Sequence, residues 1–423
     1  MIYVHVPFCR SFCTYCDFYS EVATRCRRAD DAIRQEALFG EFAQALAGEV
    51  RFRAGEISDD VNTLYIGGGT PSVLPLSAFQ ALLSALRETG HPGPFDEFTV
   101  EVNPEDIVDK GSSYVEGLLE LGVNRISMGV QSFDDSVLKF MNRRHDSATA
   151  RKAYGILEDA GVRNISIDLI FGLPQLSPAQ WAETLDKALN ISSRGVVPQH
   201  ISSYQLSVEP GSMLARLVEK GAWSEASEEL CQEQYAALCA ALSSAGYHHY
   251  EISNFAQPDF EARHNSAYWR HVPYVGLGPG AHSYISAGGS ALLEEDKRLH
   301  LRRWNHPDLR AYLKAACAGD FSSVQEGESL DADQLIIERL MLGLRTSAGL
   351  PESFLHAHCN PSALSRAISA GHLVAIDSAP LGDCGSKASN GHFTGSNRSL
   401  PESYLRIPES QFFISDSIIA SLL

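Results

Sequence analysis

The sequence predicts an α/β protein in which six βα units form a partial (β/α)6 barrel of the TIM type. Short apolar runs alternate with longer segments of helical period through the N-terminal half, which is the pattern of repeated βα units around a parallel sheet. Glycine or polar residues stand where most of these runs end. Because the functional sites of such barrels lie at the carboxyl ends of the strands, these residues are the first candidates for a site.

The individual elements follow in order along the chain. Helices are expected at 31–53 and 76–87, and another is expected between a cap near Ser147 and a stop at Gly161. The second strand leads into the turn GGGTP at 67–71. The six strands are expected at 2–6, 61–66, 98–102, 123–128, 164–170 and 200–206.

Three cysteines with CxxxCxxC spacing, Cys9, Cys13 and Cys16, follow the first strand. A structural zinc site uses four nitrogen or sulfur ligands, and a cubane iron–sulfur cluster held by protein alone uses four thiolates. Three closely spaced thiols therefore favour a cluster with one iron left open to a small molecule. The alternative is that these thiols are buried without a ligand, as the other six cysteines are expected to be.

Polar residues and a glycine triplet occupy the other strand ends. Glycines at 67–69 let the backbone approach a ligand closely, and Pro71 fixes the exit from the turn. The alternative for the two carboxylates is a structural role, because buried carboxylates commonly pair with arginine or cap helices. The polar residues at these ends are Glu101, Asn103, Gln131 and Asp168.

Composition and charge narrow the class of protein. The hydrophobic fraction of 44% and the charged fraction of 20% are typical of a soluble globular protein. A formal net charge of −18 argues against a nucleic-acid partner, because phosphate binding needs a clustered basic excess. Nine cysteines, three of them crowded together, indicate a reducing compartment and no disulfide framework. With neither a long apolar run nor a leader pattern, the sequence predicts a cytoplasmic protein without a transmembrane segment.

Together these motifs resemble radical S-adenosylmethionine (SAM) proteins of the oxygen-independent coproporphyrinogen III oxidase-like group. The resemblance begins with YVHVPF at 3–8, the cysteines and GGGTP, and covers nearly the whole chain. It continues through EVNP at 101–104, GVQSF at 129–133, RRH at 143–145 and DLIFGLP at 168–174. It implies a radical SAM barrel in which Cys9, Cys13 and Cys16 ligate a 4Fe–4S cluster, with SAM on the fourth iron.

The resemblance also implies which residues line the SAM pocket. Arg144 is an adjacent alternative to Arg143, and His282 lies in a loop that resembles the SAM-side loop of the family. In this family the reduced cluster passes an electron to the sulfonium of SAM. The residues expected to bind SAM are Tyr3, Tyr15, Gly68, Gly69, Thr70, Glu101, Gln131, Arg143, Asp168 and His282.

Within the group, the chain is most similar to the HemW-type haem chaperones. HNSAYW at 264–269 matches their HNxxYW motif, which implies that His264 is an axial ligand of haem, with His271 and His282 as nearby alternatives. The oxidases carry a segment before the first strand and a further cysteine two residues after the third ligand, where this chain has Phe18. Both differences favour the chaperones.

The expected function is therefore to bind haem and transfer it to acceptor proteins, for example respiratory ones. No nucleic-acid partner is expected, and peripheral association with a membrane is compatible with this function. The alternative is an oxygen-independent coproporphyrinogen III oxidase, which decarboxylates its substrate oxidatively to protoporphyrinogen IX. A radical enzyme that degrades haem is a third candidate. Whether SAM is cleaved or merely bound stays open.

Three parts are expected along the chain. The barrel would occupy 1–245, and a linker carrying HNSAYW would occupy 246–300. By resemblance, 301–423 forms a helical, winged-helix-like domain with wing strands at 371–376 and 404–407. Between these strands, a Gly/Ser/Asn-rich insertion near 380–399 has the composition of a mobile loop and is longer than the wing needs.

Overall fold

The computed structural model describes residues 1–22, 29–58, 60–287, 299–376 and 403–423. The insertion near 380–399 lies outside the described residues. The chain forms two compact units, and the segment expected as a linker contributes to both. The first unit consists of Met1–His248, Phe255–His264 and Val272–Leu330, and the second of His249–Asn254, Asn265–His271 and Asp331–Leu423.

A nine-stranded sheet forms the centre of the first unit, in the order β11-β1-β4-β5-β6-β7-β8-β10-β9. Strands β1 to β8 in this order pair in parallel, and they confirm the six predicted strands with small shifts at their ends. The six are β1 (Ile2–Val6), β4 (Thr63–Gly68), β5 (Glu97–Val102), β6 (Arg125–Gln131), β7 (Ile165–Phe171) and β8 (His200–Gln205).

Three short edge strands were not predicted. β11 (Val275–Leu277) pairs in parallel with β1, and β10 (Asn254–Ala256) and β9 (His248–Glu251) follow β8. Runs of three or four residues are too short to show a periodic pattern, so these strands could not be predicted. β11 nevertheless places the loop after it at the same edge of the sheet as the cysteine loop after β1, because the two strands are parallel.

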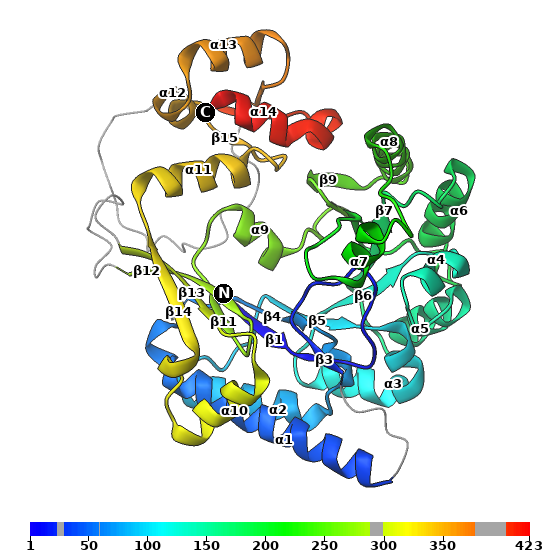
Figure 1. The fold of residues 1–423 in the computed structure, drawn as a ribbon, viewed down its shortest axis with the longest axis vertical. Coiled ribbons are helices and arrows are strands. Elements are labelled where there is room, and N and C mark those ends of the chain that lie inside the picture. Colours follow the sequence, from blue (N-terminus) through cyan, green and yellow to red (C-terminus); the bar gives the residue numbers. More distant parts are fainter. Residues whose placement is uncertain (23–28, 59, 288–298, 377–402) are drawn as a thin grey trace, which may run out of the picture. The chain divides into compact units, whose positions relative to one another are not determined.

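Amphipathic helices pack around the outside of the strands (Figure 1). Their starts follow local capping chemistry: Ser177 and Gln180 form a capping box on α6, and Asp146, not Ser147, is the N-cap of α5. The helices are α1 (Ala29–Phe52), α2 (Leu76–Glu88), α3 (Pro104–Glu120), α4 (Asp135–Phe140), α5 (Ser147–Asp159), α6 (Pro178–Leu189), α7 (Met213–Glu219) and α8 (Glu228–Ser244).

The two faces of the sheet differ in polarity. Successive side chains of a strand point to opposite faces, so alternate residues share one environment. One set is apolar and fully buried beneath the helices, for example Leu64, Val100 and Ile167. The alternate set is polar and points into the barrel: Thr63, Tyr65, Thr99, Glu101, Arg125, Ser127 and Asp168. The apolar core therefore lies outside the sheet, and the barrel interior is polar.

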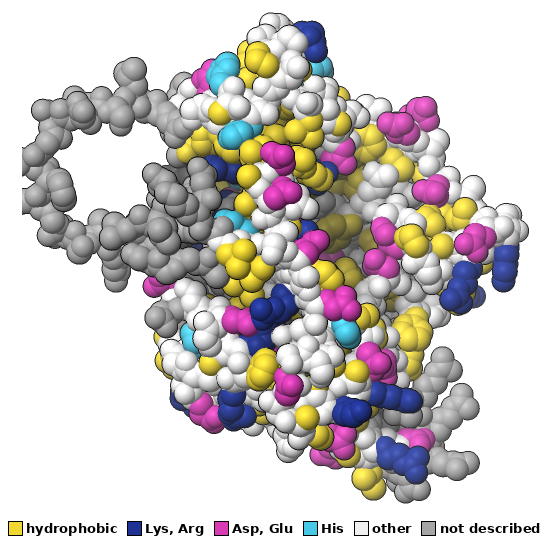
Figure 2. All heavy atoms as spheres, turned by 60° about the vertical axis from the view of Figure 1, so that its left-hand side comes forward, with side chains coloured by type: hydrophobic (Ala, Val, Ile, Leu, Met, Phe, Trp, Pro, Cys, Tyr) yellow, Lys and Arg dark blue, Asp and Glu magenta, His cyan; other side chains and the backbone are white. Residues whose placement is uncertain are grey.

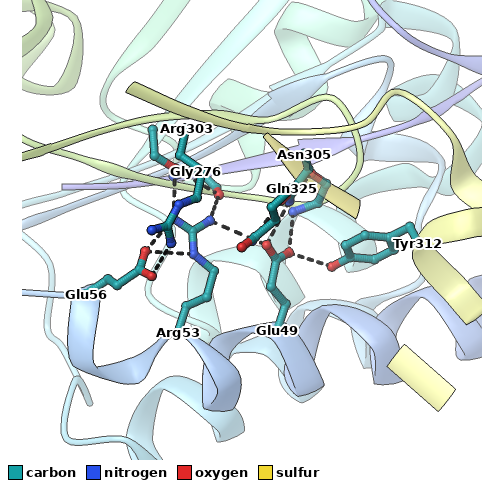
Figure 3. Close-up of polar contacts among 10 residues, drawn as sticks. Glu49, Arg53, Glu56, Gly276, Arg303, Asn305, Tyr312 and Gln325 are labelled. Carbon is teal, nitrogen blue, oxygen red and sulfur yellow. Dashed lines mark hydrogen bonds and ion pairs between the residues drawn. The ribbon is translucent and has the colours of Figure 1, made fainter. Parts of the chain in front are cut away.

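A buried ion network fastens α1 to the segments after β11 (Figure 3). Arg53 donates to the backbone oxygen of Gly276 (2.6 Å) and pairs with Glu56 (2.8 Å). Glu49 accepts from the hydroxyl of Tyr312 (2.7 Å) and from the amide of Asn305 (2.7 Å). Glu49 also accepts from the backbone nitrogen of Gly278, so the network fixes the loop that follows β11. A buried pair of charges is tolerated because each is hydrogen-bonded.

An antiparallel sheet completes the first unit. It consists of β12 (His282–Ala287), β13 (Leu299–Asn305) and β14 (Gln325–Leu330), with α10 (Leu309–Ala318) between the last two strands. Arg303 on β13 pairs with Glu56, which joins this sheet to the network around Arg53. Residues 301–330, expected in the C-terminal domain, thus belong to the barrel unit.

The second unit contains helices and a three-stranded antiparallel sheet in the order β15-β17-β16. β16 (Val374–Ile376) and β17 (Tyr404–Arg406) confirm the two predicted wing strands. Helix α9 (Arg263–Trp269) carries HNSAYW, and its first two residues, Arg263 and His264, belong to the first unit. The other elements are α11 (Ala332–Gly343), β15 (Leu350–Pro351), α12 (Glu352–His358), α13 (Pro361–Ser369) and α14 (Ser415–Leu422).

Charges of both signs are interspersed on the face seen in Figure 2, and the described residues there form no continuous basic surface. Binding to a nucleic-acid backbone would need such a surface. Within the described ranges, no helix has the length and apolar character needed to cross a membrane.

Candidate functional site

The cysteine loop lies at the carboxyl end of β1 and is closed by its own short strands. β2 (Phe8–Cys9) pairs in parallel with β3 (Glu21–Val22). The backbone of Thr14 hydrogen-bonds to Met141 (3.1 Å) and to Leu214 (2.8 Å), which fixes the middle of the loop to the end of α4 and to the first turn of α7. Cys9, Cys13 and Cys16 are all free thiols and are half-buried.

A chain of hydrogen bonds joins two of these thiols across three strand ends. The hydroxyl of Thr70, after β4, donates to Sγ of Cys9 (3.5 Å) and accepts from the amide of Asn103, after β5 (3.2 Å). Asn103 Oδ1 accepts from Nη2 of Arg143 (2.7 Å), which also donates to the backbone oxygen of Gly129 (2.7 Å). Arg143 Nη1 then lies 3.4 Å from Sγ of Cys13. The strand ends predicted to meet are thus connected directly.

The three thiols have the chemistry that a cluster needs. Burial raises the pKa of Cys9 and raises that of Cys16 to about 12, so these two thiols are protonated near neutral pH when no metal is bound. Metal binding deprotonates such thiols, and the cation then compensates the buried thiolate charge. Two polar atoms beside the thiols, Nε of Arg143 and Oγ1 of Thr14, are buried without a hydrogen-bond partner among the described residues. Unpaired buried polar atoms are expected where a bound group supplies the missing partner.

In the described ranges, no three or more His, Cys, Asp or Glu side chains lie close enough together to hold one metal ion. The fit of a cluster therefore rests on the chemistry of the three thiols and on their surroundings.

The glycine triplet packs against the start of the cysteine loop. Gly68 has φ +104°, which favours glycine, and a Cβ there would lie 2.7 Å from the ring of His5. A Cβ on Gly69 would lie 2.7 Å from the backbone oxygen of Phe8. The triplet thus lets the two strand ends touch. His5 is held in place by the backbone oxygen of Tyr19 (2.8 Å) and the hydroxyl of Tyr3 (3.1 Å).

Glu101 and Asp168 point into the barrel with their own partners. Glu101 accepts from the hydroxyl of Tyr65 (2.7 Å) and from the backbone nitrogen of Gly68 (3.2 Å). Its pKa is raised to about 7, chiefly by burial and further by the nearby charge of Asp168. Asp168 accepts from Ser127 (3.1 Å), and burial raises its pKa as well. Both side chains keep partial solvent access. Two carboxyl groups with partial solvent access therefore line the barrel interior.

Other residues expected to bind SAM lie in different surroundings. Tyr15 is close to Cys13 and Arg143; burial raises its pKa, and the positive charge of Arg143 opposes that rise. Gln131 has φ +69° at a register shift in β6, a strained backbone of the kind common at functional sites. His282 is exposed at the start of β12 and stacks on Trp304 (ring centroids 5.9 Å apart). Burial lowers the pKa of His5, and the charge of His282 lowers it further.

His264 is buried in the barrel, 1% exposed. Its Nδ1 lies 2.9 Å from the hydroxyl of Thr63, and its ring stacks on Tyr65 with centroids 5.2 Å apart. Its backbone nitrogen donates to Glu97 (2.9 Å). Burial lowers its pKa to about 3, and the charges of the N-terminus and Arg125 lower it further, so the imidazole is neutral. The alternative ligand His271 belongs to the second unit and pairs with Glu338 (3.0 Å).

A cavity of about 1020 Å³ lies outside the cysteine loop. Arg10 and Ser11 of the loop form part of its wall, and Arg143 reaches from this wall to Cys13. Lys110, Tyr114 and Arg144 complete its basic side. The guanidinium of Arg10 forms ion pairs with the carboxylates of Asp106 (2.8 Å) and Asp109 (2.7 Å), which balance its charge.

Some residues of the site were not assigned from the sequence. They are Tyr65, Thr63 and Arg125, which point into the barrel, whereas Asn103, a candidate by its place at a strand end, bridges Thr70 and Arg143. Every second residue of each strand faces the interior, so these residues can be identified from the sequence once one inward residue of the strand is known. Arg125 is 1% exposed, and its Nε has no hydrogen-bond partner among the described residues.

The fold and the three-cysteine loop define a radical SAM protein, and residues 3–188 match the Radical SAM superfamily. The solved structure of coproporphyrinogen III oxidase (HemN) from Escherichia coli, a radical SAM enzyme, has a similar fold. It gives a TM-score of 0.73 at 22% identity and covers 100% of this chain and 89% of its own.

Two relatives identify the family within this class. The heme chaperone HemW of Synechocystis is 33% identical over 348 residues, which cover 82% of this chain and 78% of the relative. The heme chaperone HemW of Bacillus subtilis is 32% identical over 349 residues, which cover 82% of this chain and 84% of the relative. This chain belongs to the HemW family, as its motifs predicted.

Proposed function

We propose that this protein is a haem chaperone, which binds haem and transfers it to acceptor proteins. The observation that carries the proposal is membership of the HemW family together with the HNSAYW motif on α9. The nine cysteines, of which all described ones are free, are compatible with a reducing compartment.

In this proposal, Cys9, Cys13 and Cys16 hold a 4Fe–4S cluster and the barrel interior holds SAM. When bound, a reduced cluster with SAM on its open iron supplies one-electron cleavage of the sulfonium. The chain itself supports the thiolates through Thr70 and Arg143, and lines the interior with Glu101 and Asp168. A pocket with two carboxyl groups suits a ligand that carries positive charge and hydroxyl groups. SAM has a sulfonium, an ammonium and a ribose.

His264 is the proposed axial ligand of haem. Its imidazole is neutral, which is the form that binds iron. Because it is 1% exposed and fixed by Thr63, haem iron can reach it after the contacts of His264 with Thr63 and Tyr65 open locally. Such an opening is a reasonable property of a chaperone, which must also release its cargo.

The test measures haem binding and enzyme turnover on the same preparation. The cluster is reconstituted anaerobically, haem is titrated by absorbance, and coproporphyrinogen III is supplied with SAM and a reductant. We expect about one haem per chain and no turnover of coproporphyrinogen. Turnover at enzymatic rates without stoichiometric haem binding would instead identify an oxidase.

A further inference from the structure

Tyr65 contacts both halves of the proposed site. Its hydroxyl donates to Oε1 of Glu101 (2.7 Å), which belongs to the proposed SAM pocket. Its ring stacks on the imidazole of His264, with centroids 5.2 Å apart and planes 29° apart. One side chain of β4 thus touches the carboxylate on one side and the haem motif on the other.

We propose that Tyr65 is a positioning residue through which occupancy of the SAM pocket changes the affinity of His264 for haem. The inference rests on the proposed function, and it adds a coupling between two ligands that the function alone does not require. Coupling of this kind needs an element whose position both ligands influence.

The surroundings of Tyr65 restrict how its ring can respond. A Cβ on Gly67 would lie 2.8 Å from Cε1 of Tyr65 and 2.8 Å from Oε1 of Glu101, so the ring and the carboxylate pack directly over this glycine. A ligand that donates hydrogen bonds to the Glu101 carboxylate competes with the Tyr65 hydroxyl for the same acceptor. Because the backbone of β4 blocks one side, a displaced ring must move relative to His264.

His264 is held on its other sides by fixed groups. Thr63 is two residues from Tyr65 on the same strand and lies 2.9 Å from Nδ1 of His264. Glu97 accepts from the backbone nitrogens of His264 (2.9 Å) and Arg263 (2.7 Å). Thr63 thus holds the imidazole and Glu97 holds the backbone beside it, at the first residues of β4 and β5. A shift of the Tyr65 ring therefore changes how easily the imidazole leaves its site.

The test is a linkage measurement on full-length protein with its cluster reconstituted anaerobically. The haem dissociation constant is measured with and without saturating SAM, and the SAM dissociation constant with and without haem. The two ratios must agree, because coupling is reciprocal. In wild-type protein we expect a ratio of about fivefold or more. Tyr65→Phe keeps the ring and removes the hydroxyl. In this variant we expect each ligand to change the dissociation constant of the other by less than about twofold.

Tyr312→Phe is the matched control. Tyr312 is on α10, and its hydroxyl donates to a buried glutamate, Glu49. The hydrogen bond measures 2.7 Å, the same as that between Tyr65 and Glu101. We expect the control to retain the wild-type ratio. If Tyr65→Phe does not fold, Tyr65→Met fills much of the same volume without a hydroxyl and is measured in its place.

Each outcome decides the proposal. A wild-type ratio of one, or an unchanged ratio in Tyr65→Phe, overturns the coupling while the haem chaperone stands. Wild-type protein that binds SAM and no haem overturns the proposed function and the coupling with it. The coupling is supported if Tyr65→Phe still binds both ligands but its haem dissociation constant no longer depends on SAM.

Discussion

Arg143 lies with Nη1 3.4 Å from Sγ of Cys13, and its second terminal nitrogen is shared by Asn103 and the backbone oxygen of Gly129. The guanidinium therefore faces one of the three thiols proposed to hold the cluster. Arg144, the adjacent alternative, is exposed. The structure thus favours Arg143 as the arginine that contacts the site. A cation beside a thiolate ligand stabilises the reduced, more negative cluster.

We expect Arg143→Gln to lower the reduction potential of the reconstituted cluster by roughly tens of millivolts, because a charged hydrogen bond to a cluster sulfur is lost. The potential is measured by redox titration followed by electron paramagnetic resonance. Arg144→Gln is the control and should leave the potential unchanged. A loss of SAM affinity in Arg143→Gln with an unchanged potential would show that the guanidinium serves SAM and not the thiol.

Cys13→Ala should abolish the visible absorbance and the iron content of the reconstituted protein while leaving the chain folded. The loop lies at the mouth of the barrel, and Cys13 is half-buried there, outside the apolar core. We expect the free energy of unfolding of the metal-free chain to change by less than about 1 kcal/mol. Cys239→Ala, which removes a free thiol on α8, should retain the cluster. If the Cys13→Ala chain no longer unfolds cooperatively, the placement of the loop outside the apolar core is wrong.

His264→Ala should weaken haem binding by about tenfold or more with the cluster intact, because it removes the proposed axial ligand. Haem titration and the haem absorbance spectrum measure the effect. His271→Ala, in the second unit, is the matched control, and its haem spectrum should match that of wild type. An unchanged spectrum in His264→Ala together with an altered one in His271→Ala would transfer the ligand role to His271.

The raised pKa of Glu101 predicts a pH dependence of stability. The folded chain holds this proton up to about pH 7, whereas the unfolded chain releases it near its usual pKa of 4.5. The folded state thus binds the proton more tightly, and stability falls as pH rises between these values. In Glu101→Gln we expect this fall to be smaller by roughly 1 to 2 kcal/mol, measured by urea unfolding of the metal-free chain. Glu116→Gln, an exposed carboxylate on α3, should reproduce the wild-type slope, and an identical slope in all three proteins would refute the shift.

Arg53→Ala should cost about 3 kcal/mol or more of unfolding free energy, because it leaves the buried Glu49 without its neighbouring cation and Gly276 without its donor. Arg51 provides the control from the same turn of α1, since it makes an exposed pair with Glu88. Arg51→Ala should cost less than about 1 kcal/mol. Equal losses in the two variants, by urea unfolding, would mean that the network in Figure 3 contributes little.

The features predictable from the sequence were the local ones. The six strands, the cysteine loop and the glycine triplet are each specified by a few adjacent residues, and parallel strands necessarily bring their carboxyl ends together. The connection of Thr70, Asn103 and Arg143 was not predictable, because it depends on side chains from three strand ends meeting at hydrogen-bond distance.

Burial and long-range contacts were the other features beyond prediction. HNSAYW indicated His264, but nothing in the motif indicates that its ring stacks on Tyr65 inside the barrel. The network around Glu49 joins residues more than two hundred positions apart, so no periodic pattern reports it. Residues 301–330 join the barrel unit for the same reason: β13 and β14 pair with β12, not with the C-terminal elements.

The most direct test of the central claim is an electron paramagnetic resonance spectrum of the reduced, anaerobically reconstituted protein with and without SAM. A cluster held by Cys9, Cys13 and Cys16 with an open iron predicts about four irons per chain and a spectrum that changes when SAM is added. One tetrahedral zinc in place of the irons, or a spectrum indifferent to SAM, would contradict it.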